Sequence, residues 1–166
     1  MPTYSDKAGL IAIAASVATI DQLTKLLLVS TIGRSRLEPR IEVVHGWLAM
    51  EYTENRGAAF GLLSGLVPIL TVVSIAILTG LLLHFMRQVR PPLWQTVAIG
   101  AIAGGAFGNL LDRFRLGYVI DFVSVGPWPN FNIADSAITI GVMVLIWGST
   151  RPAAASAMPP AIHNGR

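Results

Sequence analysis

Four apolar stretches constrain this chain more than any other feature, because each approaches the roughly 20 residues that cross the hydrocarbon core of a bilayer. They cover residues 8–30, 66–86, 93–111 and 133–149. The second stretch contains no Lys, Arg, Asp or Glu and is rich in Leu, Ile and Val. The pattern predicts an all-α membrane protein whose four transmembrane helices form one domain over residues 1–150.

The composition argues against a soluble domain. Of the 166 residues, 53% are hydrophobic and 13% are charged, which is about half the charged share of a soluble protein. Lys and Arg are scattered singly, so the net charge of +3 predicts no nucleic-acid partner. The chain has no cysteine, and His45, His84 and His163 lie far in sequence from its acidic motifs. We therefore expect no disulfide, no thiol chemistry and no metal site.

The segments outside the apolar stretches are of two kinds. Residues 31–65 are polar but carry Val43, Trp47, Leu48 and other apolar side chains at alternating positions, so we expect a small β-rich segment there. Residues 151–166 are rich in Ala, Pro and polar side chains and predict a disordered tail. The Lys and Arg counts on the two sides of the predicted bundle are too similar to choose an orientation.

The third apolar stretch carries Gly100, Gly104 and Gly108 at four-residue spacing. These glycines lie on one face of a helix, where the absence of side chains lets a neighbouring backbone approach closely. We therefore expect this face to lie inside the bundle. A phosphate-binding glycine loop is the weaker interpretation, since no GxxxxGK[ST] pattern accompanies the glycines.

Several polar side chains interrupt the apolar stretches, at a cost of about 2.5 kcal/mol or more each if they lie at membrane depth. Asp21 and Lys25 are four residues apart, which predicts an ion pair on one helix face, with a structural or a catalytic role. Asn109, Asp112 and Arg113 end the third stretch on a shared face. There, the amide and the guanidinium could bind a substrate carbonyl or form an interfacial cap.

Asp121 and Asp135 are the candidate catalytic pair. Asp121 is flanked by apolar residues, and Asp135 opens the fourth stretch, where it could also cap the helix. Asn132 precedes Asp135 by three residues and could support the same carboxylate. Two carboxylates within hydrogen-bonding distance cannot both ionise cheaply, so one keeps its proton. Such a pair can activate water and polarise a peptide carbonyl.

Two other classes of function stay open at this point. A small transporter could relay protons or ions through its intramembrane charged groups, but no inverted repeat is visible. A membrane scaffold could use the aspartates as helix caps and the glycine face for helix association. The scaffold hypothesis predicts that Asp121→Asn and Asp135→Asn leave every activity intact.

Taken together, the motifs resemble the lipoprotein signal peptidase family, also called signal peptidase II. Five blocks stand in the order of that family and, with the four stretches, cover nearly everything from residue 8 to 150. They are Asp21-Gln-Leu-Thr-Lys25, Asn55-Arg-Gly-Ala-Ala-Phe60-Gly61, Gly105-Ala-Phe-Gly-Asn109-Leu-Leu-Asp112-Arg113, Val119-Ile-Asp121-Phe122 and Phe131-Asn132-Ile-Ala-Asp135-Ser136.

The resemblance implies an aspartic endopeptidase of the bacterial inner membrane, with Asp121 and Asp135 as its catalytic pair and no cofactor. It also implies that both termini, including the tail 151–166, are cytoplasmic, and that segment 31–65 is extracytoplasmic with the active site near the outer face. Its implied substrate is a prolipoprotein with diacylglycerol on a cysteine, cut just before that cysteine. We expect a monomer that contacts membrane lipid. By the same resemblance, the residues that line or support the site are Asn55, Asn109, Arg113 and Asn132, while Asp21 and Lys25 belong to a structural polar set.

Overall fold

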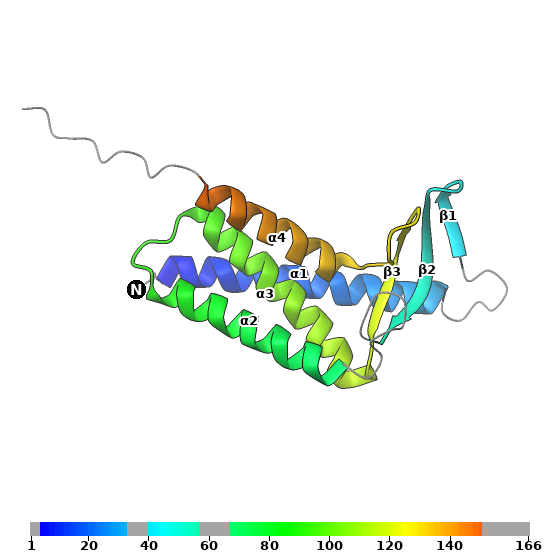
Figure 1. Cartoon of the computed structure of the whole chain (residues 1–166), viewed down its shortest axis with the longest axis horizontal. Helices are drawn as coiled ribbons and strands as arrows, with labels where there is room; N and C mark the ends of the chain where they lie inside the picture. Colours follow the sequence, from blue (N-terminus) through cyan, green and yellow to red (C-terminus); the bar gives the residue numbers. More distant parts are fainter. Residues whose placement is uncertain (1–3, 33–39, 57–66, 151–166) are drawn as a thin grey trace, which may run out of the picture.

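The computed structural model describes residues 4–32, 40–56 and 67–150. Within these ranges the chain forms four helices and three strands (Figure 1). The predicted tail 151–166 and parts of segment 31–65 lie outside the described residues. In chain order the elements are α1 (Tyr4–Thr31), β1 (Arg40–Val44), β2 (Leu48–Asn55), α2 (Val67–Arg87), α3 (Leu93–Leu116), β3 (Val119–Val125) and α4 (Ile133–Ser149).

Helix α3 is the centre of the bundle, because it packs against α1, α4 and α2. The sheet lies at one end of the helices, and the start of α1 and the end of α4 both lie at the other end (Figure 1). The bundle therefore has two unlike ends. One end carries the sheet, and the other carries the start of α1 and the end of α4.

The glycine face of α3 lies against α1, as predicted. A Cβ atom at Gly104 would overlap the carbonyl oxygen of Ala14 and lie 2.8 Å from Cβ of Val17. A Cβ at Gly108 would lie 2.7 Å from a carboxylate oxygen of Asp21. The packing interpretation of these glycines is confirmed, and the close approach of the two helices depends on the missing side chains.

The outer surface of the helices is largely apolar. Helix α1 is long and apolar enough to cross a membrane over Asp6–Thr31, whereas the apolar helical segments Thr71–Arg87 and Ile133–Ser149 are shorter. Exposed apolar surface of this extent is typical of lipid contact. The large exposed residues include Ile11, Ile20, Leu23, Leu26 and Leu27 on α1, Ile69, Val72, Val73 and Ile77 on α2, and Ile140, Met143, Ile146 and Trp147 on α4.

The third helix is longer than the apolar stretch that predicted it. Helix α3 continues past residue 111 to Leu116 and stops at Gly117, whose backbone has φ of 80°. The Gly117 N–H donates to the carbonyl of Arg113 at 3.0 Å, as in a left-handed helix cap. The helix therefore ends where glycine permits a left-handed residue, and not where the apolar run ends. The predicted bounds 133–149 coincide with α4.

The sheet has the order β1-β2-β3, with both pairs antiparallel. Strands β1 and β2 confirm the predicted β-rich segment, but the sheet is not confined to residues 31–65. Its third strand, β3, comes from the connection between α3 and α4. Residues Val119–Phe122 are all buried, so β3 shows no alternation of apolar and polar side chains that would have predicted a half-exposed strand.

Candidate active site

Asp121 and Asp135 come from different elements that meet at the sheet end of the bundle. Asp121 lies on β3, where it pairs with Thr53 of β2, and it is buried with 1% of its surface exposed. Asp135 lies in the first turn of α4 and is half-buried. Strand β3 and the start of α4 thus each contribute one carboxylate.

Asn132 connects the two carboxylates. Its side-chain amide donates to Oδ1 of Asp121 at 2.7 Å, and its backbone N–H donates to Oδ2 of Asp135 at 3.2 Å. Its Oδ1 accepts from the backbone N–H of Asp135 at 2.9 Å, so Asn132 and Asp135 also form a capping box at the start of α4. The support that we predicted from Asn132 to Asp135 is present through the backbone, while the side chain reaches Asp121.

Two further asparagines complete the contacts of the pair. Asn55, at the end of β2, donates from Nδ2 to Oδ2 of Asp121 at 2.8 Å. Asn109, on α3, donates from Nδ2 to Oδ1 of Asp135 at 2.7 Å. Each of the four carboxylate oxygens therefore accepts one amide N–H. Neutral donors orient both carboxylates, and within the described part of the chain neither carboxylate makes a direct ion pair that would hold it permanently charged.

Burial dominates the electrostatics of Asp121. It raises the pKa of this carboxyl to about 6, and the negative charge of Asp135 adds to the rise. The hydrogen bonds from Asn55 and Asn132 and the positive charge of Lys25 act in the opposite direction. Because burial disfavours the ionised form, Asp121 retains its proton to a higher pH than an exposed aspartate.

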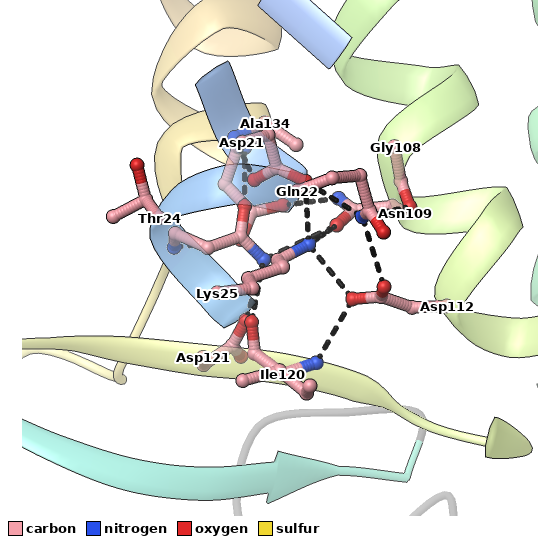
Figure 2. Close-up of polar contacts among 12 residues, drawn as sticks. Asp21, Gln22, Thr24, Lys25, Gly108, Asn109, Asp112, Ile120, Asp121 and Ala134 are labelled. Atoms are coloured by element: carbon pink, nitrogen blue, oxygen red, sulfur yellow. Dashed lines mark hydrogen bonds and ion pairs between the residues drawn. The ribbon is translucent and has the colours of Figure 1, made fainter. Parts of the chain in front are cut away.

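A buried charged cluster of Asp21, Lys25 and Asp112 lies next to Asp121 (Figure 2). The Nζ atom of Lys25 is 2.8 Å from Oδ2 of Asp21 and 2.8 Å from Oδ2 of Asp112. It also donates to Oδ1 of Asn109 at 3.3 Å. The predicted Asp21–Lys25 pair is present, and it faces the interior of the bundle.

The charged cluster also contacts the main chain near both catalytic candidates. The backbone N–H of Ala134 donates to Oδ1 of Asp21 at 3.0 Å, and the N–H of Ile120 donates to Oδ2 of Asp112 at 3.2 Å. Ala134 and Ile120 each immediately precede one of the two candidate aspartates in the chain. The cluster thus ties α1 and α3 to the start of α4 and to β3.

Sequence reasoning missed two contributors to this cluster. Asp112 was considered only with its helix-terminal neighbours, although its position one turn after Asn109 is a signal that it faces the same interior. Gln22 donates from Nε2 to Oδ1 of Asp112 at 3.0 Å and to Oδ2 of Asp21 at 3.2 Å. Arg113 is half-buried, and its side chain makes no hydrogen bond or ion pair with the described residues. Its role in the site stays a prediction.

A polar contact set holds the end of β2 that carries Asn55. The hydroxyls of Tyr52 and Tyr118 are 3.1 Å apart, and the guanidinium of Arg56 lies 5.2 Å from the centre of the Tyr118 ring. Arg56 also pairs with Glu54 at 2.7 Å, which lowers the pKa of that exposed carboxyl. Tyr118 follows the cap of α3, so these contacts join the Asn55 end of β2 to the α3–β3 corner.

A cavity of about 400 Å³ opens beside Asp135. Asp135 and the side chains of Trp128, Phe131 and Ile140 line this groove, together with Ser136 and Thr139. The groove is predominantly apolar, and it brings one carboxylate of the pair to an accessible surface on α4. Among residues 4–32, 40–56 and 67–150, no group of three His, Cys, Asp or Glu side chains is arranged to hold a metal ion.

Comparisons with known proteins identify the family. The sequence profile of signal peptidase (SPase) II matches residues 13–151. The lipoprotein signal peptidase of Parasynechococcus marenigrum is 40% identical over 148 residues, covering 86% of this chain and 91% of the relative. That of Halothermothrix orenii is 37% identical, covering 78% of this chain and 87% of the relative.

Solved structures agree with these relatives. Two structures of a bacterial membrane enzyme superpose on this chain with TM-scores of 0.74 and 0.76, at 35% and 34% identity. The first covers 84% of this chain and 86% of its own, and the second covers 87% and 94%. Both the fold and the sequence are therefore those of a membrane peptidase. This chain belongs to the signal peptidase II family of aspartic proteases, which remove the signal peptides of lipoprotein precursors.

Proposed function

We propose that this chain cleaves diacylglyceryl-modified prolipoproteins just before the lipidated cysteine, using a water molecule activated by Asp121 and Asp135. The observation that carries the proposal is the amide cage around the pair, in which Asn55, Asn109 and Asn132 supply one N–H to each carboxylate oxygen. Such a cage orients two carboxylates for acid and base catalysis. An ion relay or a helix cap would not require it.

The proposed hydrolysis requires one of the two carboxyl groups to be protonated and the other to be ionised. The ionised carboxylate takes a proton from water as the water oxygen attacks the scissile carbonyl carbon, while the protonated carboxyl donates to the carbonyl oxygen. In the second step the C–N bond breaks, and the amine of the lipidated cysteine leaves with a proton from the pair. The pair titrates as a unit, so neither proton belongs to one aspartate throughout the cycle.

The groove beside Asp135 supports a substrate that arrives through the bilayer. Its apolar lining of Trp128, Phe131 and Ile140 suits a lipidated or strongly apolar segment, and it lies on the outward face of α4. Seating such a segment would displace bulk water from around the pair, apart from the attacking water molecule. The resulting loss of hydration would strengthen every electrostatic interaction at the site.

We further propose that all four helices span the bacterial inner membrane as a monomeric domain of residues 1–150, with both termini cytoplasmic and the sheet outside. The helical part of α4 has 17 residues and is therefore about 25 Å long, slightly short of the roughly 30 Å hydrocarbon core. Trp128, just before α4, is 70% exposed and suits a membrane interface. This orientation is supported by the position of the start of α1 and the end of α4, which lie together at the end opposite the sheet. We also propose that Arg113 supports the site near the outer face.

Cleavage by purified protein in detergent tests the proposal. We expect wild type to shorten a diacylglyceryl-modified prolipoprotein by its signal peptide, while Asp121→Asn and Asp135→Asn lower the rate by at least about a thousandfold. Gel shift and mass spectrometry of the product locate the cut.

Asp6→Asn is the matched control, because it makes the same chemical change in the first turn of α1, at the opposite end of the bundle. It should cleave at the wild-type rate. Wild-type rates from a folded Asp121→Asn or Asp135→Asn protein would refute the assignment of the pair.

A further inference from the structure

We propose that Lys25 is a positioning residue that acts through Asn109: its ammonium holds the Asn109 amide with the oxygen toward α1 and the NH₂ group toward Asp135. This inference rests on the proposed function and adds a role for a buried charge that does not itself contact the catalytic pair. The proposal also distinguishes Lys25 from a residue that only holds two helices together.

The contacts of the ammonium leave little freedom. Lys25 is 2% exposed and makes three contacts, with Asp21, Asp112 and Asn109 (Figure 2). A lysine ammonium has three N–H donors and no acceptor. Each hydrogen thus has one oxygen partner, and the third partner is the side-chain oxygen of Asn109.

The orientation of the Asn109 amide follows from these donors. Its Oδ1 accepts from Lys25 at 3.3 Å and from Nδ2 of Asn132 at 3.1 Å, while its Nδ2 donates to Oδ1 of Asp135 at 2.7 Å. A flipped amide would direct its NH₂ group at an ammonium and a second amide NH₂, and its oxygen at a carboxylate oxygen. All three contacts would then be repulsive or unsatisfied.

The consequence for the site is geometric. Asp135 is only half-buried and borders the groove, so its carboxylate could rotate unless both oxygens are held. Asn132 holds one oxygen through its backbone and Asn109 holds the other. The charged cluster therefore fixes the carboxylate plane from the protein interior, through a neutral amide that leaves the shared proton free to move.

A double-mutant cycle tests the inference with the same prolipoprotein assay. We expect Lys25→Met to lower kcat by about 10- to 100-fold, because misplacing a reacting group by about 1 Å can cost up to about 100-fold, with KM changed by less than about threefold. In an Asn109→Ala background, Lys25→Met should cost less than about threefold more, because its target is already gone. An equal cost in both backgrounds, or wild-type kcat in a folded Lys25→Met protein, would overturn the proposal.

Lys25→Met leaves the buried Asp21 and Asp112 carboxylates without a counter-charge and could prevent folding. The Asp21→Asn/Lys25→Met protein reduces that risk, because it keeps the net charge of the cluster and leaves the cluster with only one buried carboxylate, Asp112, which still accepts from Gln22 and from the N–H of Ile120. The amide oxygen introduced at position 21 can still accept the N–H of Ala134. This double variant should show the same low kcat and the same loss of effect when Asn109→Ala is added, and wild-type kcat would contradict the inference. Wild type and Asp121→Asn are run alongside. Failure of wild type to cleave, or cleavage by Asp121→Asn, would refute the proposed function and not the role of Lys25.

Discussion

Asn132 shows how much a single residue can organise in this site. It uses its backbone on Asp135, its side-chain NH₂ on Asp121 and Asn109, and its side-chain oxygen to cap α4. Its side chain is fully buried. An aspartate of the same shape could still cap the helix, but it could not donate to either partner. The amide is therefore required by the pair and not only by the helix.

The pH profile reports on Asp121. Because burial raises the pKa of Asp121 to about 6, the pair loses its shared proton as pH rises through that value. The pair needs one proton, so kcat/KM, which reports on the free enzyme, should fall as pH rises through about 6. Asn55 donates to the ionised form and lowers this pKa. Asn55→Ala should therefore move the falling limb upward by about one pH unit.

Gln88→Ala is the control for this profile, because it removes a side-chain amide in the connection between α2 and α3 that contacts His84 at 3.0 Å. The falling limb of its pH profile should coincide with that of wild type. A limb that stays in place or moves to lower pH in Asn55→Ala would show that Asn55 does not stabilise the ionised form of Asp121.

At the scale of elements, the spacing of residues predicted local features well and long-range partners poorly. The Asp21–Lys25 pair and the buried glycine face of α3 both follow from helical periodicity, and both are present. The partnership of Lys25 with Asp112 joins two helices, and no local pattern could reveal it. Strand β3 escaped prediction because its buried residues follow one another without alternation, so the sheet acquired a third strand from a distant segment.

Because α1 and α3 pack closely, substitution of a glycine between them should change the stability of the protein more than substitution of a glycine elsewhere. Gly104→Ala should destabilise the protein by about 1–3 kcal/mol, since the added methyl meets backbone atoms of Ala14 that cannot move independently. Gly80→Ala is the matched control, because it lies in α2, where a Cβ atom would meet none of the described residues beyond its own stretch of helix within 4 Å. It should be neutral or stabilising by up to about 1 kcal/mol. Thermal unfolding in detergent measures both, and equal melting temperatures would contradict the close packing.

At the scale of the whole molecule, the catalytic candidates and the sheet share one end, and the limits of the helical domain share the other (Figure 1). Because the chain has no cysteine, single cysteines report its orientation without background. His45, in the β1–β2 turn, has a fully exposed side chain at 100%. Val89, in the α2–α3 connection, is 70% exposed.

We expect a membrane-impermeant maleimide to label His45→Cys in intact spheroplasts, and to label Val89→Cys only after permeabilisation. The physical reason is that the proposed spans separate the two positions by the bilayer. The reverse pattern would invert the proposed orientation, and equal labelling of both in intact spheroplasts would contradict a membrane between them.

The distribution of the charged cluster over two helices has a consequence for biogenesis. Helix α1 precedes α3 in the chain, so Asp21 and Lys25 are synthesised before Asp112 and Asn109. The nascent α1 then carries only its own ion pair until α3 arrives. In the proposed topology we therefore expect that packing of α3 against α1 completes both the hydrogen bonds of the Lys25 ammonium and the orientation of the amide beside Asp135.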